Sequence, residues 1–144
     1  MLRNMDPILS PDLLHALAAM GHGDRIVIAD ANFPGHSLGP PCIDAPGVDA
    51  SRMLGAVLSL LPLDDFAGDA AVTMQVVGDP EAVPEAVADF QLIVTSEADH
   101  PATLTSVERF AFYDLAREAF VIVLTGEGRL YGNIILTKGV IPAG

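Results

Sequence analysis

The stretches Ala119–Thr125 (AFVIVLT) and Arg25–Asp30 (RIVIAD) decide the fold. Each contains a nearly unbroken run of apolar, largely β-branched residues, which is typical of a strand covered on both faces. Strands of this kind form parallel sheets with helices packed against them. The two stretches therefore predict an α/β protein with a mostly parallel sheet.

The segments around these two strands alternate between helical and extended patterns. Ser10 is a candidate N-cap for a first helix, with Pro11 in its first turn and Gly21 at its end. The other predicted elements are a helix 49–61 capped by Asp49, a strand 70–77, a helix 84–97, a strand 103–107, a helix 109–118 and a strand 133–137. No linker or repeat interrupts the pattern, so residues 1–144 are expected to form a single domain, a sheet flanked by helices.

The composition excludes several functional classes. The formal net charge is -12, with only 7 Lys and Arg, which argues against nucleic acid and anionic membranes as partners. No apolar run reaches the roughly 18–20 residues of a membrane span, and the N-terminus does not resemble a signal peptide. One cysteine, Cys42, rules out an internal disulfide and suits a reducing cytoplasm.

Polar side chains gather at the ends of the predicted strands, where sites of α/β sheets lie. His22 stands between two glycines and can exchange protons near neutral pH, although a turn histidine is the commoner explanation of its position alone. Asp30 ends its strand, where it either accepts hydrogen bonds from hydroxyls or closes a turn. Arg109 begins a helix, where it either binds a ligand or pairs with Glu108 or Asp114.

The turn Tyr131–Asn133 offers neutral donors and acceptors that suit a sugar, and turn chemistry explains it equally well. Cys42 has no close cysteine or histidine partner in the sequence, and the histidine spacings match no zinc pattern, so no metal is predicted. Asp64-Asp65 is interpreted as a solvated loop. The phenylalanines assigned to the core are Phe110, Phe112 and Phe120. Motifs alone thus indicate an α/β domain with a polar pocket.

Four short motifs in a fixed order resemble the L-fucose mutarotase / D-ribose pyranase (RbsD/FucU) family. They are MGHGD at 20–24, DANFPGHS at 30–37, RFAFYDLA at 109–116 and YGNIIL at 131–136. The resemblance covers nearly the whole chain, but residues 80–107 carry no signature, and GEGRLYGN is only similar to the family's usual turn. The family's RbsD-like fold is a single α/β domain.

The resemblance implies an isomerase that interconverts the anomers of a free monosaccharide. Proton transfer suffices for this reaction, so no cofactor is expected. His22 is implied as the catalytic proton donor, and Asp30 is expected to hold sugar hydroxyls and to tune His22. The implied sugar-binding residues are Asp30, Arg109, Tyr131, Gly132 and Asn133. His36 and Tyr113 are second candidates for the pocket.

Arg109 and Gly132 are typical of the fucose branch, whereas the ribose branch has histidine and alanine at these positions. L-fucose is therefore the expected sugar. Members of the family form rings, commonly two stacked pentamers, with pockets completed by the neighbouring chain. A cytoplasmic homodecamer is thus expected. The alternatives are a D-ribose pyranase, which interconverts pyranose and furanose, and a non-catalytic module for sugar binding or transport. Water and Tyr131 are both open as acceptors of the anomeric proton.

Overall fold

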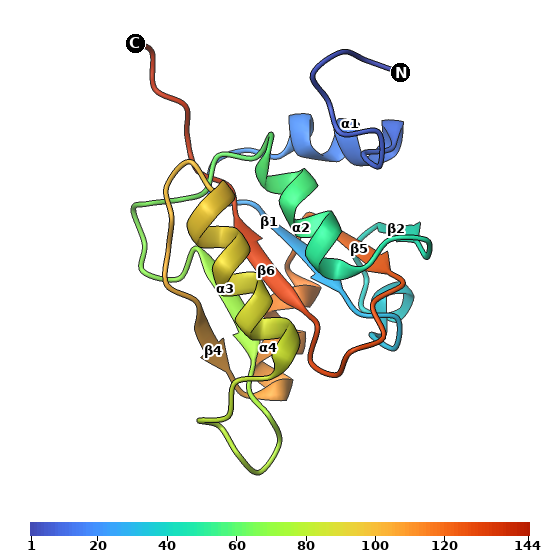
Figure 1. Cartoon of the computed structure of the whole chain (residues 1–144), viewed down its shortest axis with the longest axis vertical. Coiled ribbons are helices and arrows are strands. Elements are labelled where there is room, and N and C mark those ends of the chain that lie inside the picture. The colour runs from blue at the N-terminus through green and yellow to red at the C-terminus, as the bar shows by residue number, and fades with distance from the viewer.

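The computed structural model describes residues 1–144 and is built on one six-stranded sheet (Figure 1). Its strands are β1 (Arg25–Ala29), β2 (Cys42–Ala45), β3 (Ala71–Met74), β4 (Thr105–Val107), β5 (Val121–Thr125) and β6 (Ile134–Thr137). They lie in the order β2-β5-β1-β6-β3-β4. All run in one direction except β6, which is antiparallel to its neighbours β1 and β3. The predicted α/β fold with a mostly parallel sheet is confirmed.

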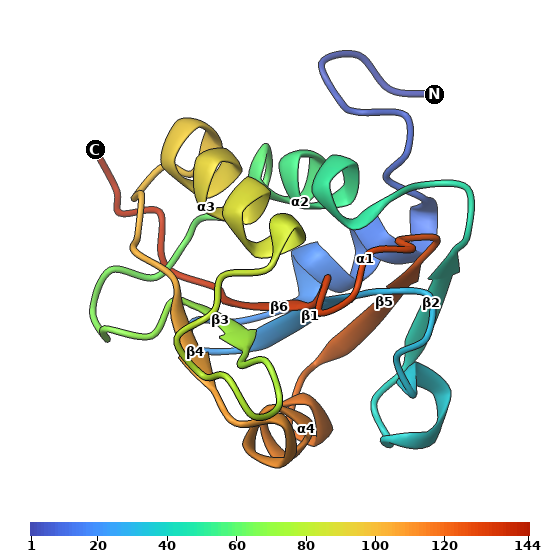
Figure 2. The same cartoon turned by 60° about the horizontal axis from the view of Figure 1, so that its bottom comes forward.

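Helices cover both faces of this sheet (Figure 2). They are α1 (Pro11–Ala19), α2 (Ala50–Leu58), α3 (Glu85–Glu97) and α4 (Arg109–Arg117), and a short 3-10 turn, η1, spans Gly35–Ser37. Alternate residues of β1 point to opposite faces. Ile26 and Ile28 pack with α1, α2 and α3, whereas Val27 and Ala29 pack with α4. None of these helices combines the length and the apolar character that spanning a bilayer would require.

Side-chain caps fix where three of the helices begin. The hydroxyl of Ser10 accepts a hydrogen bond from the backbone N–H of Leu13 at 3.2 Å, and Asp49 accepts one from that of Arg52 at 2.7 Å. Both residues were predicted as caps, and both predictions are confirmed. Glu108 caps α4 in the same way through the N–H groups of residues 110 and 111. Each cap satisfies backbone donors that have no partner within the helix.

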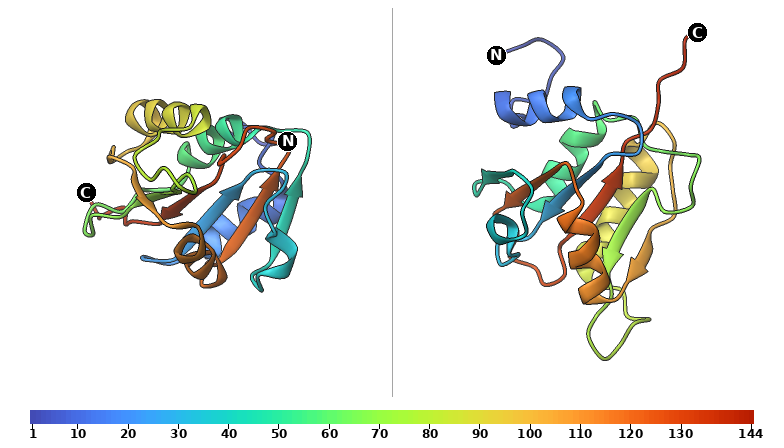
Figure 3. Two further views of the ribbon diagram at one scale, coloured as in Figure 1. Left: turned by 90° about the horizontal axis from the view of Figure 1, so that it is seen from below. Right: turned by 180° about the vertical axis from the view of Figure 1, so that it is seen from behind.

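Two features of the sheet differ from the sequence-based expectation. Strand β2 was not among the predicted elements; it is a short edge strand whose partly exposed residues follow Pro41 and carry no apolar run. Strand β6 runs antiparallel because it is reached from β5 through residues 126–133, and a parallel crossover takes about a dozen residues or more. Since β1 lies between β5 and β6, this connection crosses the carboxyl end of β1 (Figure 3). The fold thereby brings the 126–133 loop directly over Asp30.

Candidate functional site

Asp30 and Asn133 form a reciprocal pair at the carboxyl end of β1. The backbone N–H of Asp30 donates to Oδ1 of Asn133 at 2.7 Å, and Nδ2 of Asn133 donates to Oδ2 of Asp30 at 3.1 Å. Oδ1 of Asp30 accepts from the N–H of Asn32. Both side chains are buried, and burial raises the pKa of the Asp30 carboxyl, which these hydrogen bonds offset only in part. Two of the predicted sugar-binding residues thus form one polar unit.

Tyr131 lies beside this pair in an unusual backbone conformation. Its φ of 59° is in the left-handed region, which costs a non-glycine residue of order 1–3 kcal/mol. Its hydroxyl accepts a hydrogen bond from the N–H of Val77 at 3.1 Å, and its carbonyl accepts one from the N–H of Asn133 at 2.8 Å. These contacts link the turn to the segment after β3 and hold the ring in a defined direction.

Gly132 completes this turn at a point where the chain is tightly packed. A Cβ atom there would lie 2.7 Å from Cγ of Glu127, 3.2 Å from the carbonyl oxygen of Arg129 and 3.6 Å from Cβ of Asp30. The Glu127 side chain occupies the space that an alanine methyl group would need. Packing within the chain therefore explains the glycine without reference to the sugar.

Gly132→Ala should lower the free energy of unfolding by about 1–3 kcal/mol, because the added methyl group forces the buried Glu127 side chain to move. Urea denaturation measures the effect. Gly55→Ala is the matched control, since nothing lies within 4 Å of a Cβ built at Gly55 in the middle of α2. That variant should be at least as stable as the wild type. Equal stabilities of the two variants would contradict the packing argument.

Arg109 begins α4 at the same edge of the sheet, after the end of β4. Neither carboxylate expected from the sequence pairs with it, because Glu108 caps the helix and Asp114 pairs with Arg117 at 2.7 Å. The guanidinium lies over the ring of Phe110, 4.7 Å from its centroid, and its buried Nε has no hydrogen-bond partner. A side chain in this state is ready to donate to a ligand.

A pocket of about 260 Å³ opens beside this arginine. Its lining residues are Gln75, Val76, Val77, Gly78, Pro80, Glu108, Arg109 and Phe110. Phe110 is 61% exposed and Phe120 is 38% exposed, so assigning these two to the core was wrong, whereas Phe112 is buried as predicted. The Tyr131 hydroxyl accepts a hydrogen bond from the N–H of Val77, which lines the pocket. The pocket therefore adjoins the Tyr131–Asn133 turn.

His22 lies at the opposite edge of the sheet, before the start of β1. Strand β1 has five residues and rises about 3.3 Å per residue, so about 15 Å of strand lies between the end that follows His22 and the end that carries Asp30. Nε2 of His22 is 3.1 Å from Oδ1 of Asp64, and its ring packs against Phe66 with 5.2 Å between centroids. One chain therefore brings Asp30, Arg109, Tyr131, Gly132 and Asn133 to one edge but leaves His22 at the other.

Asp64 is the carboxylate that contacts His22, and the expectation that Asp30 would tune this histidine does not hold within one chain. The interpretation of Asp64 as part of a solvated loop was also wrong, because it is only 5% exposed. Burial raises the pKa of Asp64, but hydrogen bonds from His22, Phe66 and Ala67 together outweigh burial and leave the pKa below its ordinary value. Asp64 therefore remains ionised beside the histidine at neutral pH.

Asp64→Asn should destabilise the protein at neutral pH and much less in acid. Because the pKa of Asp64 is lower in the folded than in the unfolded chain, its contribution is present above the unfolded value near 3.8 and is lost as the pH falls through the folded value. Urea denaturation of both proteins at pH 7 and in acid measures this difference. A stability difference that stays the same at both pH values would contradict the assignment.

The second candidates, His36 and Tyr113, make no hydrogen bond with the Asp30–Asn133 pair. His36 bonds to Asp44 at 2.8 Å, and Cys42 lies beside them, with the three donor atoms within 4.8 Å of one another. Cys42 thus has a histidine neighbour that the sequence spacing did not reveal. Burial, and then Asp44, raise the pKa of the thiol, so Cys42 is protonated at neutral pH. Tyr113 is half-buried and packs against Phe33 at 5.7 Å.

Residues 3–141 match the model of the RbsD / FucU transport protein family. The protein Atu2016, a putative sugar binding protein, is 41% identical, with 99% of this chain and 97% of that chain covered and a TM-score of 0.93. The fucose mutarotase of Streptococcus pneumoniae, solved with L-fucose, is 38% identical over 98% and 100% of the chains, with a TM-score of 0.90. FucU of Bifidobacterium longum is 37% identical over 96% and 99%, with a TM-score of 0.87. The chain belongs to the RbsD / FucU family.

Proposed function

We propose that this protein is an isomerase, a mutarotase that interconverts the α and β anomers of L-fucose. The observation that carries the proposal is Arg109, whose buried Nε has no partner in the chain and whose side chain lines the pocket next to the Tyr131 turn. A guanidinium in this position can donate to the ring and hydroxyl oxygens of a sugar. The similarity to the mutarotase solved with L-fucose supports this choice of sugar.

The proposed reaction opens the hemiacetal, rotates the aldehyde about one carbon–carbon bond and closes the ring on the opposite face. Opening needs a proton on the ring oxygen and the loss of the anomeric hydroxyl proton. His22 supplies the first proton and takes it back on closure, while a water molecule or the Tyr131 hydroxyl takes the anomeric proton and returns one to the aldehyde oxygen on closure. Asp64 orients the imidazole through Nε2. Because the His22 side chain is 47% exposed, Nδ1 is then free to face the sugar. Nothing is oxidised or reduced, so proton transfer between positioned groups suffices.

Asp30, Arg109, Tyr131, Gly132 and Asn133 form the sugar-binding edge in this proposal. The buried Asp30 carboxylate accepts hydrogen bonds from sugar hydroxyls, and Asn133 holds it in place. Arg109 and Tyr131 donate to sugar oxygens from the side of the pocket. The small Gly132 allows the turn to lie close to Asp30.

A second copy of the chain completes the proposed site. His22 and the sugar-binding edge lie at opposite ends of β1, a strand about 15 Å long, which is too far for both to contact one monosaccharide. A ring of identical subunits solves this problem, because a head-to-tail contact brings the His22 edge of one copy to the Asp30 edge of the next. We propose a decamer of two stacked pentamers in the cytoplasm, where the single cysteine suits reducing conditions.

Magnetisation exchange between the anomeric proton signals of L-fucose tests this function. Adding the protein should increase the rate at which saturation passes from one anomer to the other, and the increase should scale with protein concentration. D-ribose is the comparison sugar, since faster exchange between its pyranose and furanose forms would favour the pyranase alternative. No acceleration with either sugar would refute the proposal.

A sugar-binding function without catalysis is the second candidate. It is favoured by the similarity to Atu2016, which is described as a putative sugar binding protein. The same residues would serve it, because binding requires the Asp30 edge but no proton donor. Saturable binding of L-fucose, seen as chemical-shift changes in the protein, combined with no anomer exchange would select this function over the mutarotase.

A further inference from the structure

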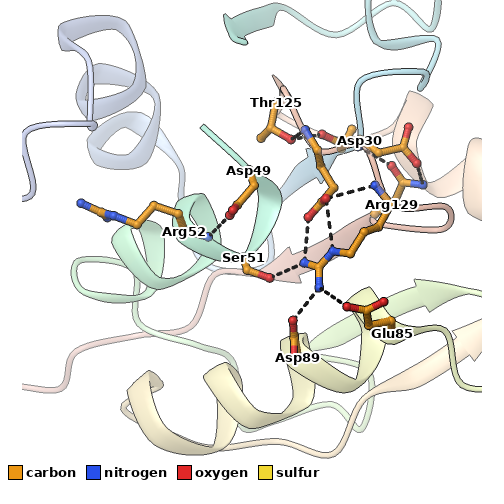
Figure 4. Close-up of polar contacts among 11 residues, drawn as sticks. Asp30, Asp49, Ser51, Arg52, Glu85, Asp89, Thr125 and Arg129 are labelled. Atoms are coloured by element: carbon orange, nitrogen blue, oxygen red, sulfur yellow. Dashed lines mark hydrogen bonds and ion pairs between the residues drawn. The ribbon is translucent and has the colours of Figure 1, made fainter. Parts of the chain in front are cut away.

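Arg129 makes the densest set of polar contacts in the 126–133 loop (Figure 4). Its Nε lies 3.2 Å from Oε2 of Glu127 and its Nη2 lies 2.9 Å from Oε1. The guanidinium therefore donates two parallel hydrogen bonds to that carboxylate. Nη1 donates to Asp89 of α3, and Nη2 donates to the hydroxyl of Ser51 of α2 at 2.8 Å. One side chain therefore ties the loop to two helices.

Arg129, Glu127, Asp89 and Ser51 form a polar cluster. Its central pair, Glu127 and Arg129, is largely shielded from water and is not a loose surface ion pair. The side chain of Glu127 is 4% exposed and that of Arg129 is 27% exposed. Arg129 is the largest cause that holds the pKa of Glu127 below its ordinary value, and burial opposes it. Removing the arginine would leave a buried carboxylate without its main partner, which is strongly destabilising for the local structure. The loop conformation therefore depends on the guanidinium.

The residues that the cluster holds are next to the sugar-binding edge. Glu127 lies beneath Gly132, and the carbonyl of Glu127 accepts a hydrogen bond at 2.9 Å from the N–H of Ala31, which follows Asp30. Tyr131, two residues after Arg129, has the left-handed backbone that only surrounding contacts can maintain. A shift of Arg129 would thus be transmitted to Tyr131 and to Asn133.

We propose that Arg129 is a positioning residue of the sugar site: its bonds to Glu127, Asp89 and Ser51 hold Tyr131 and Asn133 in place over Asp30. The inference rests on the proposed function, because it assigns these two residues to sugar binding. Arg129 itself acts through them and contacts no sugar. The role follows from geometry, since a binding group displaced by about 1 Å loses much of its effect.

Arg129→Ala and Arg129→Lys test the proposal, with Arg117→Ala as the matched control. Arg117 also pairs with a carboxylate, Asp114 at 2.7 Å, but both side chains are more than half exposed on α4. Amide hydrogen exchange over residues 130–133 reports the loop without any sugar. Anomer exchange over a range of L-fucose concentrations gives KM and kcat separately.

In Arg129→Ala, the amides of residues 130–133 should exchange faster while those of β1 and β5 stay protected. KM should rise about tenfold with kcat changed less, because ground-state positioning of the sugar is lost and the proton donor is untouched. Arg129→Lys should fall between this variant and the wild type, since lysine keeps the charge but not the two parallel bonds. Arg117→Ala should match the wild type in every measurement.

Unchanged loop protection in Arg129→Ala would overturn the proposal, as would faster loop exchange with an unchanged KM. Equal effects of the alanine and lysine variants would overturn the role of the two parallel bonds. If the wild type shows no anomer exchange at all, the mutarotase proposal fails separately. L-fucose binding, followed by chemical shifts, then replaces KM as the deciding measurement for Arg129, and an unchanged affinity overturns the role.

Discussion

His22→Ala should slow L-fucose anomer exchange by about two to four orders of magnitude, the usual contribution of a well-placed general acid. Nε2 of the imidazole is held by the buried Asp64, while the His22 side chain as a whole is 47% exposed. Alanine removes the proton donor without filling or emptying the core. Sugar binding should change little, because the residues proposed to hold the sugar lie at the other edge of the sheet.

Magnetisation exchange on purified protein measures this loss, with His15→Ala as the control. His15 is an exposed residue of α1, and alanine is the best helix former, so that variant should keep both stability and activity. If His22→Ala exchanges anomers as fast as the wild type, the assignment of the catalytic residue is wrong. If both variants lose activity equally, the loss reports a general disturbance and the assignment is likewise refuted.

Much of the proposed sugar-binding edge follows from local sequence features. The strand ending at Asp30 is recognisable from its apolar run, and sites of α/β sheets lie beyond such strand ends. The helix beginning at Arg109 and the strand beginning after Asn133 are also recognisable. What brings Asn133 to Asp30 is the reversed direction of β6, and the short 126–133 connection was the available signal, since it is too short for a parallel crossover.

Other features depend on contacts that no local pattern encodes. The bond between His22 and Asp64 joins residues 42 positions apart, and the bond between Arg129 and Ser51 joins residues 78 positions apart. Asp64 therefore looked like an ordinary loop carboxylate until the fold buried it. The lack of an ion-pair partner for Arg109 also depends on the fold. Asp114 pairs with Arg117 instead, and Glu108 caps the helix. Sequence spacing indicates which side chains can form hydrogen bonds and ion pairs, but the packing of the folded chain determines which of these form.

The separation of His22 from the Asp30 edge leads to a complementation experiment with a large expected effect. His22→Ala and Arg109→Ala should each be nearly inactive alone, since one lacks the proton donor and the other lacks the unpartnered guanidinium. In an oligomer of both variants, some sites are complete. Such a site takes His22 from an Arg109→Ala subunit and the Asp30 edge, with its Arg109, from a His22→Ala subunit. Random mixing of equal amounts should restore about a quarter of the sites.

Co-expression with two different affinity tags and purification through both gives the mixed oligomers, and anomer exchange measures their activity. The control combines Arg109→Ala with Asn133→Ala, which alter the same edge. If this edge is supplied by one chain, no pairing of these two variants makes a complete site, so that mixture should stay inactive. Recovery in the first mixture and not in the second would show that His22 acts on a sugar held by a neighbouring subunit. Two inactive mixtures would mean that His22 and the Asp30 edge do not serve a common site across subunits, because the separation within one chain leaves no other way to join them.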